Sequence, residues 1–70
     1  MELRLPIPPE QLTRAERSIL DFINTNTDAF LFLSIGQLAE RLGLSEATLS
    51  RFARHAGCRD FKALKTLVLE

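Results

Sequence analysis

Apolar residues recur along this chain at the three- and four-residue spacing that is typical of amphipathic helices. Residues 14–24 follow this spacing, and Thr13 with Glu16 forms a capping box, in which each side chain accepts a hydrogen bond from the other residue's backbone N–H. We therefore expect a first helix over residues 14–24. Asp28 is expected to cap a short helical turn over residues 29–33, where five consecutive apolar residues indicate burial.

Two further helices are predicted in the middle of the chain. A second capping box, residues 34–37, begins a third helix. The apolar positions of its inner face are Leu38, Ala39 and Leu42. Gly43 follows at once, and glycine is the residue best suited to the positive φ that ends many helices. Ser45 is a favourable N-cap for a fourth helix over residues 46–56, which Gly57 ends in the same way.

The last predicted helix begins near Asp60 and runs to the end of the chain. Its apolar positions are Phe61, Leu64, Leu67 and Val68. Residues 1–9 contain all three prolines and are expected to form an extended arm before one folded domain over residues 10–70. No segment has the apolar–polar alternation of a strand. The fold class predicted is all-α, a compact bundle of about five helices.

The third and fourth predicted helices, joined by a turn of three residues, form a helix-turn-helix. Ala39 is small at the position where the fourth helix must cross close to the third, and Gly43 permits the turn between them. Leu44, Leu49 and Phe52 supply the apolar contacts that hold the two helices at a fixed angle. A simple corner between two helices of some other α-helical protein is the alternative interpretation.

The predicted fourth helix has two different faces when its residues are placed at intervals of 100°. Its apolar face contains Leu49, Phe52, Ala53 and Ala56. Its opposite face contains Ala47, Arg51 and Arg54, with Thr48, Ser50 and His55 at the flanks. A recognition helix needs this arrangement, because its apolar side packs on the domain while short polar and guanidinium side chains enter a groove of DNA.

Several side chains of this helix have the chemistry that reads bases. Thr48 can touch a thymine methyl group, and Arg51 or Arg54 can pair with guanine or hold a phosphate. Glu46 either accepts from a cytosine amino group or stabilises the start of its own helix. An ordinary solvated surface is the alternative for each arginine, and a structural role is the favoured interpretation for His55.

The chain carries nine basic and nine acidic residues, so its formal charge is zero, but these charges are unevenly distributed. Residues 1–33 contain three basic and five acidic residues, whereas residues 46–65 contain five basic and two acidic ones. Phosphate binding responds to local potential, because the Debye length at physiological salt is about 8 Å. The segment on and after the predicted recognition helix therefore permits DNA binding. The neutral total predicts modest non-specific affinity and dependence on a second copy.

Other classes of function have little support. The longest apolar run, residues 29–33, is far shorter than the ~20 residues that cross a bilayer, and the N-terminus lacks the apolar region of a signal peptide. A single cysteine cannot form an internal disulfide and suits a reducing cytoplasm. His55 and Cys58 are too few ligands for zinc, and we expect Cys58 to be a small apolar plug. We expect no catalysis, no metal and no cofactor.

Three segments of the chain, LTRAERSILDFI, SIGQLAERLGLSEATLSRFARHAG and DFKALK, resemble the N-terminal DNA-binding domain of RpiR-type bacterial transcriptional regulators. The resemblance covers residues 12–69. Its most specific pieces are Ser34-Ile35, Ser45-x-x-Thr48-x-x-Arg51-Phe52 and Phe61-x-x-Leu64-Lys65. It implies a five-helix bundle that binds operator DNA as a homodimer. The residues it places on DNA are Ser45, Thr48, Ser50 and Arg51, with Lys65 on the DNA backbone.

The resemblance also implies a C-terminal sugar-isomerase-like (SIS) domain beyond Glu70, which senses a phosphosugar and adjusts DNA binding. The chain departs from the family pattern in two places. Residues 56–58 are Ala-Gly-Cys, where the family usually has Leu-Gly and a larger apolar residue, and Asp60 stands where glycine is common. Both departures lie where the fourth and fifth predicted helices pack together.

Our main prediction is a sequence-specific DNA-binding domain of a carbohydrate-responsive regulator in the bacterial cytoplasm, associated with the nucleoid. The helix over residues 46–56 enters the major groove. The side chains expected to fix its pose on phosphates are Ser34, Ser45, Arg59 and Lys62. The alternative is a helical protein-interaction or dimerisation module that does not bind DNA itself.

Overall fold

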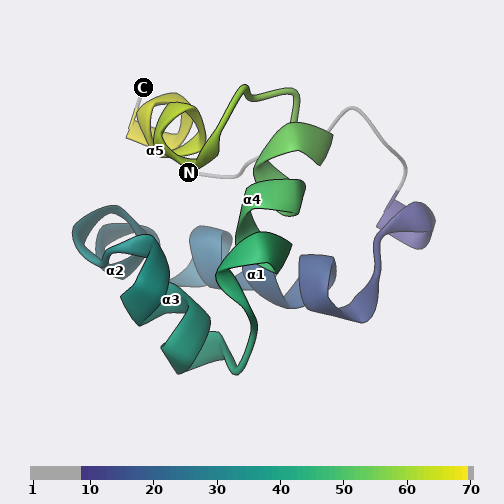
Figure 1. The fold of residues 1–70 in the computed structure, drawn as a ribbon, viewed down its shortest axis with the longest axis horizontal. Helices are drawn as coiled ribbons and strands as arrows, with labels where there is room; N and C mark the ends of the chain where they lie inside the picture. The colour runs from purple at the N-terminus through teal and green to yellow at the C-terminus, as the bar shows by residue number, and fades with distance from the viewer. Residues whose placement is uncertain (1–8, 70) are drawn as a thin grey trace.

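The computed structural model describes residues 9–69 (Figure 1). The elements are a short 3-10 helix η1 (Pro9–Gln11), then α1 (Arg14–Thr25), α2 (Thr27–Phe32), α3 (Ile35–Leu42), α4 (Glu46–His55) and α5 (Phe61–Leu69). No strand occurs in the described range, and the all-α bundle of five α-helices is confirmed. Of the predicted extended arm, residues 1–8 lie outside the described residues, and Pro9 begins η1.

The first helix, α1, begins at the capping box predicted from the sequence. Thr13 N–H donates to Glu16 Oε1 at 3.0 Å, and Glu16 N–H donates to Thr13 Oγ1 at 3.1 Å. The apolar residues that α1 buries are Ile19, Phe22 and Ile23. Asn26 then serves both as the C-cap of α1 and as the N-cap of α2, so the chain changes direction at one residue.

Two predictions for α2 are wrong. Asp28 does not cap this helix, because α2 already begins at Thr27 and Asp28 lies in its first turn. The expected burial of residues 29–33 holds for Phe30, which is 1% exposed, but not for Phe32, which is 87% exposed. Residues two apart differ by 200° around a helix, so a helix that buries one of these rings turns the other toward solvent.

The turn between α3 and α4 is a Schellman motif, which ends a helix with a residue in the left-handed region. Gly43 has φ +70°, its N–H donates to the Glu40 carbonyl at 3.3 Å, and the Leu44 N–H donates to the Ala39 carbonyl at 2.8 Å. Gly57 repeats the arrangement after α4, with φ +85°. The predicted roles of both glycines are therefore confirmed.

The last helix, α5, packs against both α2 and α4 (Figure 1). Asp60 caps it, because the Ala63 N–H donates to Asp60 Oδ1 at 2.8 Å. The residues of α5 that are buried are Phe61, Leu64 and Val68. Leu67 was expected on the same face but is 40% exposed. It lies 100° from Val68 around the helix, at the edge of the buried stripe.

Side chains from all five α-helices meet in one core, with α4 in the middle of the bundle. α4 packs against α1, α3 and α5, and its residues Leu49, Phe52 and Ala53 are fully shielded from solvent. The rings of Phe30 and Phe61 meet edge to face with centroids 5.6 Å apart, which joins α2 to α5. Only one side of α4 is therefore left at the surface.

Replacing Gly43 with alanine should lower the free energy of unfolding by about 1–2 kcal/mol, because a side chain disfavours the left-handed region. Thermal unfolding followed by circular dichroism measures this change, as a fall in Tm of about 4–8 °C per kcal/mol. Gly36→Ala is the matched control, since a Cβ there first meets the flexible end of Glu46 at 3.2 Å and φ is not positive. An equal loss in both variants would contradict the expectation.

Candidate nucleic-acid interface

The outer side of α4 is exposed, as predicted for a recognition helix. Ala47, Arg51 and Arg54 are exposed, whereas Leu49 and Phe52 on the opposite side are fully buried. Rotation of α4 about its axis would bring Phe52 into water, so the burial of the inner face determines which residues point outward. The helix ends at His55, one residue earlier than the predicted range 46–56.

The N-terminal ends of α3 and α4 both carry exposed hydroxyl caps. Ser34 Oγ accepts from the Gln37 N–H at 3.2 Å, and the Ser34 N–H donates to Gln37 Oε1 at 2.9 Å. Ser45 Oγ accepts from the Thr48 N–H at 3.1 Å and forms a second hydrogen bond with the Thr48 hydroxyl at 2.9 Å. These bonds confirm both predicted caps, and the partial positive charge of each helix start remains at the surface.

The two remaining polar candidates on α4, Glu46 and Ser50, lie at its edges. Glu46 is exposed in the first turn of α4, and its Oε2 lies 3.2 Å from the position of a Cβ built on Gly36 in α3. The carboxylate is therefore close to the starts of two helices, where negative charge is favourable. This position supports the helix-stabilising interpretation of Glu46. Ser50 is partly buried.

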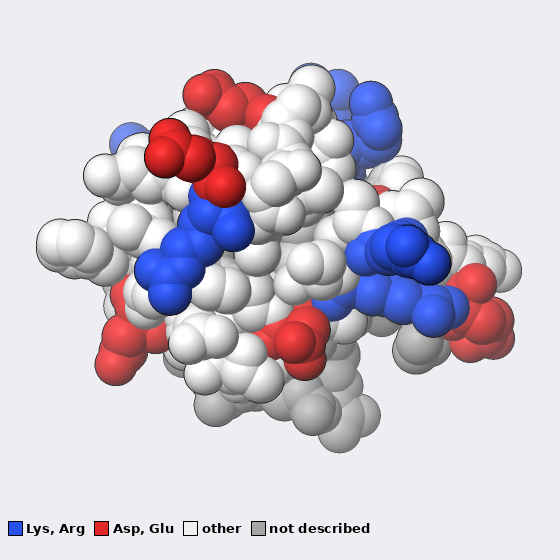
Figure 2. All heavy atoms as spheres, turned by 90° about the horizontal axis from the view of Figure 1, so that it is seen from below, with Lys and Arg blue, Asp and Glu red and all other residues white. Residues whose placement is uncertain are grey.

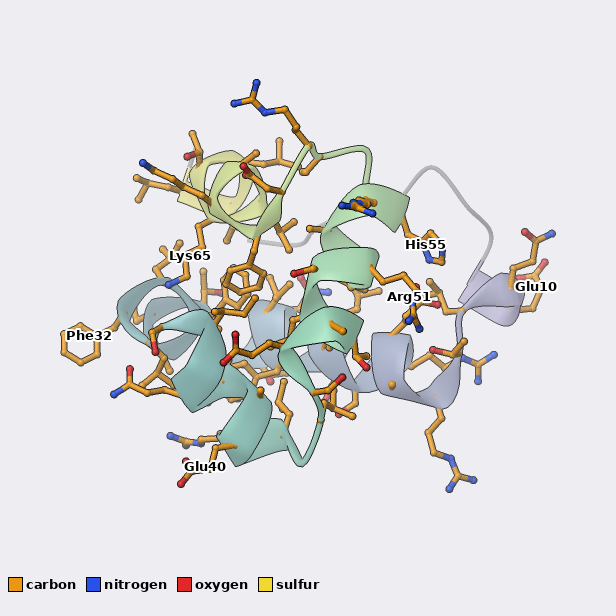
Figure 3. All side chains as sticks on the ribbon, viewed as in Figure 1. Glu10, Phe32, Glu40, Arg51, His55 and Lys65 are labelled. Carbon is orange, nitrogen blue, oxygen red and sulfur yellow. The ribbon has the colours of Figure 1, made fainter. Side chains whose placement is uncertain are left out.

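Four of the predicted basic contacts are free to bind an anion. The exposed cations on or after α4 are Arg51, Arg54, Arg59 and Lys62. None of the four forms an ion pair with a carboxylate in residues 9–69. Figure 3 shows Arg51 leaving α4 on the same side as His55. A guanidinium without an internal partner keeps all its donors for a phosphate or a guanine.

His55, by contrast, is bound within the domain (Figure 3). Its Nδ1 donates to Glu16 Oε2, and the side chain of Glu16 is only 5% exposed. Burial alone would raise the pKa of the Glu16 carboxyl, but hydrogen bonds from Thr13 and His55 outweigh burial and lower it below its ordinary value. Because an ionised carboxylate only accepts hydrogen bonds, Nδ1 of His55 carries the proton. The geometry agrees with the structural role favoured for His55.

Lys65 also turns toward the protein (Figure 3). Its Nζ donates to the Leu33 carbonyl and lies 3.5 Å from the Leu31 carbonyl oxygen, at the end of α2. Burial lowers the pKa of Lys65. A cation is favourable at the C-terminus of a helix, so Lys65 joins α5 to α2. This orientation does not suit the expected contact between Lys65 and the DNA backbone.

Basic and acidic side chains are interspersed on the face that Figure 2 shows. Small groups of each sign alternate there, with no broad area of one sign. The chain as a whole is formally neutral. Attraction to a polyanion therefore depends on individual side chains at short range rather than on the total charge.

Glu16 is a residue whose second role the sequence pattern did not reveal. Its spacing contained a signal, because it precedes Ile19 by three residues and Ile23 by seven and so lies on the buried stripe of α1. Its partner His55 is 39 residues away, and nothing local in the sequence pairs them. The contact therefore emerges only when α4 packs on α1.

The part of the chain that the structure describes offers few other residues for a metal site or a reactive thiol. No group of three His, Cys, Asp or Glu residues there could hold a metal ion. Cys58 is partly buried against the core, and burial raises the pKa of its thiol, as suits a small apolar plug. None of the helices in residues 9–69 is both long and apolar enough to cross a bilayer.

The sequence model for the helix-turn-helix domain of the rpiR family matches residues 1–70. The chain belongs to the rpiR family. It is also similar to an uncharacterized HTH-type transcriptional regulator from Clostridium perfringens, with 29% identity over 62 residues. The matched region is 89% of this chain and 22% of that regulator, so the chain spans about a fifth of its relative's length.

Membership of the rpiR family confirms the resemblance stated from the sequence and identifies the domain as a DNA-binding helix-turn-helix. In this rpiR-family domain, α3 and α4 are the helix-turn-helix pair, and the turn between them is the Gly43 motif.

Acidification should destabilise this rpiR-family domain through Glu16. The pKa of Glu16 is lower in the folded state than in the unfolded state, where it is about 4.3, so its ionised carboxylate stabilises the fold. This stabilisation is complete above the unfolded pKa and is lost as the pH falls through the folded pKa. Glu16→Gln removes the titrating group but keeps the capping box. The Tm difference between wild type and Glu16→Gln should therefore narrow between pH 6 and pH 3. A difference that stays constant over this range would contradict the assignment.

Proposed function

We propose that this domain reads the sequence of an operator in double-stranded DNA by placing α4 in the major groove. The proposal rests on the two faces of α4. Leu49 and Phe52 on one side are fully buried, while Arg51 and Arg54 on the other side are exposed. Neither arginine has a carboxylate partner among residues 9–69. A helix held in this way presents fixed guanidinium groups to a groove that is about 12 Å wide.

Base contacts are proposed for the first two turns of α4. Ala47 has too small a side chain to keep α4 away from the bases, and Thr48 stands one residue further along, at the capped end of the helix. Arg51 is one turn further, at the reach of a guanine edge, where a bidentate pair is worth about 1–3 kcal/mol of discrimination. Arg54 reads a second base or holds a phosphate.

Phosphate contacts are proposed on both sides of the groove. Ser34 and Ser45 offer the starts of α3 and α4, which attract anions through their partial positive charge. Arg59 and Lys62 are exposed after α4 and reach the backbone at its other end. Such contacts fix register without reading sequence. His55 and Lys65 are left out of this set, because Nδ1 of His55 and Nζ of Lys65 are bound within the domain.

The regulator around this domain is proposed from the family resemblance. A homodimer would place two copies of α4 about 34 Å apart, in successive major grooves on one side of the duplex. Dimerisation would also compensate for the neutral charge of a single domain, since two copies double the phosphate contacts. An SIS domain that senses a phosphosugar would adjust DNA binding, as part of a carbohydrate-responsive regulator in the bacterial cytoplasm and nucleoid.

A dimerisation module is the second candidate function, supported by exposed apolar side chains. Phe32 is 87% exposed and Leu69 is 72% exposed, on two helices that pack together. Salt separates the two candidates, because phosphate contacts weaken as salt rises whereas apolar association does not. Self-association that tolerates salt, without any DNA binding, would favour the interaction module.

Arg51→Ala should weaken binding to a duplex selected by the wild-type domain from a random pool by about 1–3 kcal/mol, and should relax the preference at one base pair. Fluorescence anisotropy at constant salt measures the affinity for the selected duplex and for its single-base variants. Arg17→Ala is the control, since it removes an exposed guanidinium from α1. Unchanged affinity and unchanged base preference in Arg51→Ala would exclude Arg51 from base reading.

Lys62→Ala should instead weaken binding to selected and unrelated duplexes alike. Loss of one phosphate contact should reduce the slope of log Kd against log salt by about one. Titrations at several salt concentrations measure this slope for both kinds of duplex. If the variant keeps the wild-type slope, Lys62 does not contact a phosphate.

A further inference from the structure

The contact between His55 and Glu16 is different in kind from the other contacts that hold α4. The inner face of α4 is held by Leu49, Phe52 and Ala53, through apolar packing that has little directionality. In residues 9–69, the His55–Glu16 hydrogen bond is the one side-chain hydrogen bond that joins α4 to another helix. It is also charge-assisted, which makes it stronger than a neutral bond.

The position of this contact on α4 links it to the exposed face. His55 follows Arg51 by four residues, which places it about 40° from Arg51 around the helix. Figure 3 shows Arg51 and His55 leaving α4 on the same side. A directional contact at this edge adds to the restraint that the buried face of α4 already places on rotation about the helix axis. The orientation of Arg51 therefore depends on how His55 is held.

Glu16 is itself fixed before it meets His55. Its Oε1 accepts from the Thr13 N–H at 3.0 Å, and its own N–H donates to the Thr13 hydroxyl at 3.1 Å. The second oxygen, Oε2, is the one that accepts from His55. The first turn of α1 thus holds a rigid, buried acceptor for the last residue of α4.

We propose that Glu16 and His55 are positioning residues for DNA recognition, and that their hydrogen bond refines the rotation of α4, within the limits that its buried face allows, and hence the aim of Arg51. This inference rests on the proposed function of α4 as the recognition helix. It gives His55 an indirect role in place of the direct DNA contact considered from the sequence. Glu16 is buried, so its effect on DNA binding is expected to be indirect as well.

The loss of a negative charge and the loss of the contact with His55 should change DNA affinity in opposite directions in Glu16→Gln. Removing a negative charge from a DNA-binding domain should strengthen binding if only electrostatics matters. Under the proposal, Glu16→Gln weakens binding to the duplex selected by the wild-type domain, by roughly tenfold, as expected for loss of a charge-assisted hydrogen bond. Glutamine still caps α1, as Gln37 caps α3 through the same kind of box, but its amide nitrogen then faces His55 Nδ1. At best a neutral hydrogen bond to the other imidazole tautomer replaces the charge-assisted one.

The experiment is a double-mutant cycle with Glu16→Gln, His55→Ala and the double variant, measured by fluorescence anisotropy on the selected duplex. Each single variant should weaken binding by a similar factor, and the double variant should be less than twofold weaker than either, because both changes break one contact. Equal or tighter binding by Glu16→Gln would overturn the proposal. An additive result would also overturn it: if His55→Ala lowers the affinity as much in the Glu16→Gln variant as in the wild type, His55 acts on DNA directly and not through Glu16.

Thr13→Ala is the matched control for stability. It removes the hydroxyl half of the same capping box but leaves the Glu16–His55 contact in place. Circular dichroism establishes that each variant is folded at the temperature of the binding assay. Thr13→Ala should bind the duplex within twofold of wild type, and a tenfold loss there would show that stability rather than position lowers the affinity. If the wild-type domain selects no duplex at all, the proposed function fails, which is a distinct result.

Discussion

Gly43, with its left-handed backbone, determines where α3 ends and how the chain enters α4. It ends α3 and places Leu44 back over Ala39, so that α4 starts at a defined angle. From this start, α4 enters the centre of the bundle and buries Leu49 and Phe52 completely. The exposed side of α4 is then determined by elimination, because a helix with one buried face can present only the other.

The same geometry explains how a chain with no net charge can bind a polyanion. Several of the described carboxylates lie at the starts of helices: Glu16 and Glu46 stand in the first turns of α1 and α4, and Asp60 caps α5. Arg51 and Arg54 keep their donors free in the described part of the chain. Recognition by a few fixed side chains suits this arrangement better than attraction through a broad electrostatic field, because salt screens distant charges within about 8 Å.

Most of the fold could be predicted from the sequence because its signals are local. Capping boxes at Thr13 and Ser34 and the glycines after α3 and α4 each act within a few residues, and all were confirmed. Errors arose where the outcome depends on packing. Phe32 was expected inside because its neighbours are apolar, but the register of α2 turns it outward. The partners of the candidate site residues His55 and Lys65 lie more than 30 residues away, beyond any local pattern.

An NMR titration of the isotope-labelled domain with a duplex that it selects would show whether DNA lies against the exposed side of α4. The largest backbone amide shifts should occur in the first two turns of α4 and at the start of α3. Shifts concentrated around Phe32 and the end of α5, with α4 unaffected, would contradict this expectation.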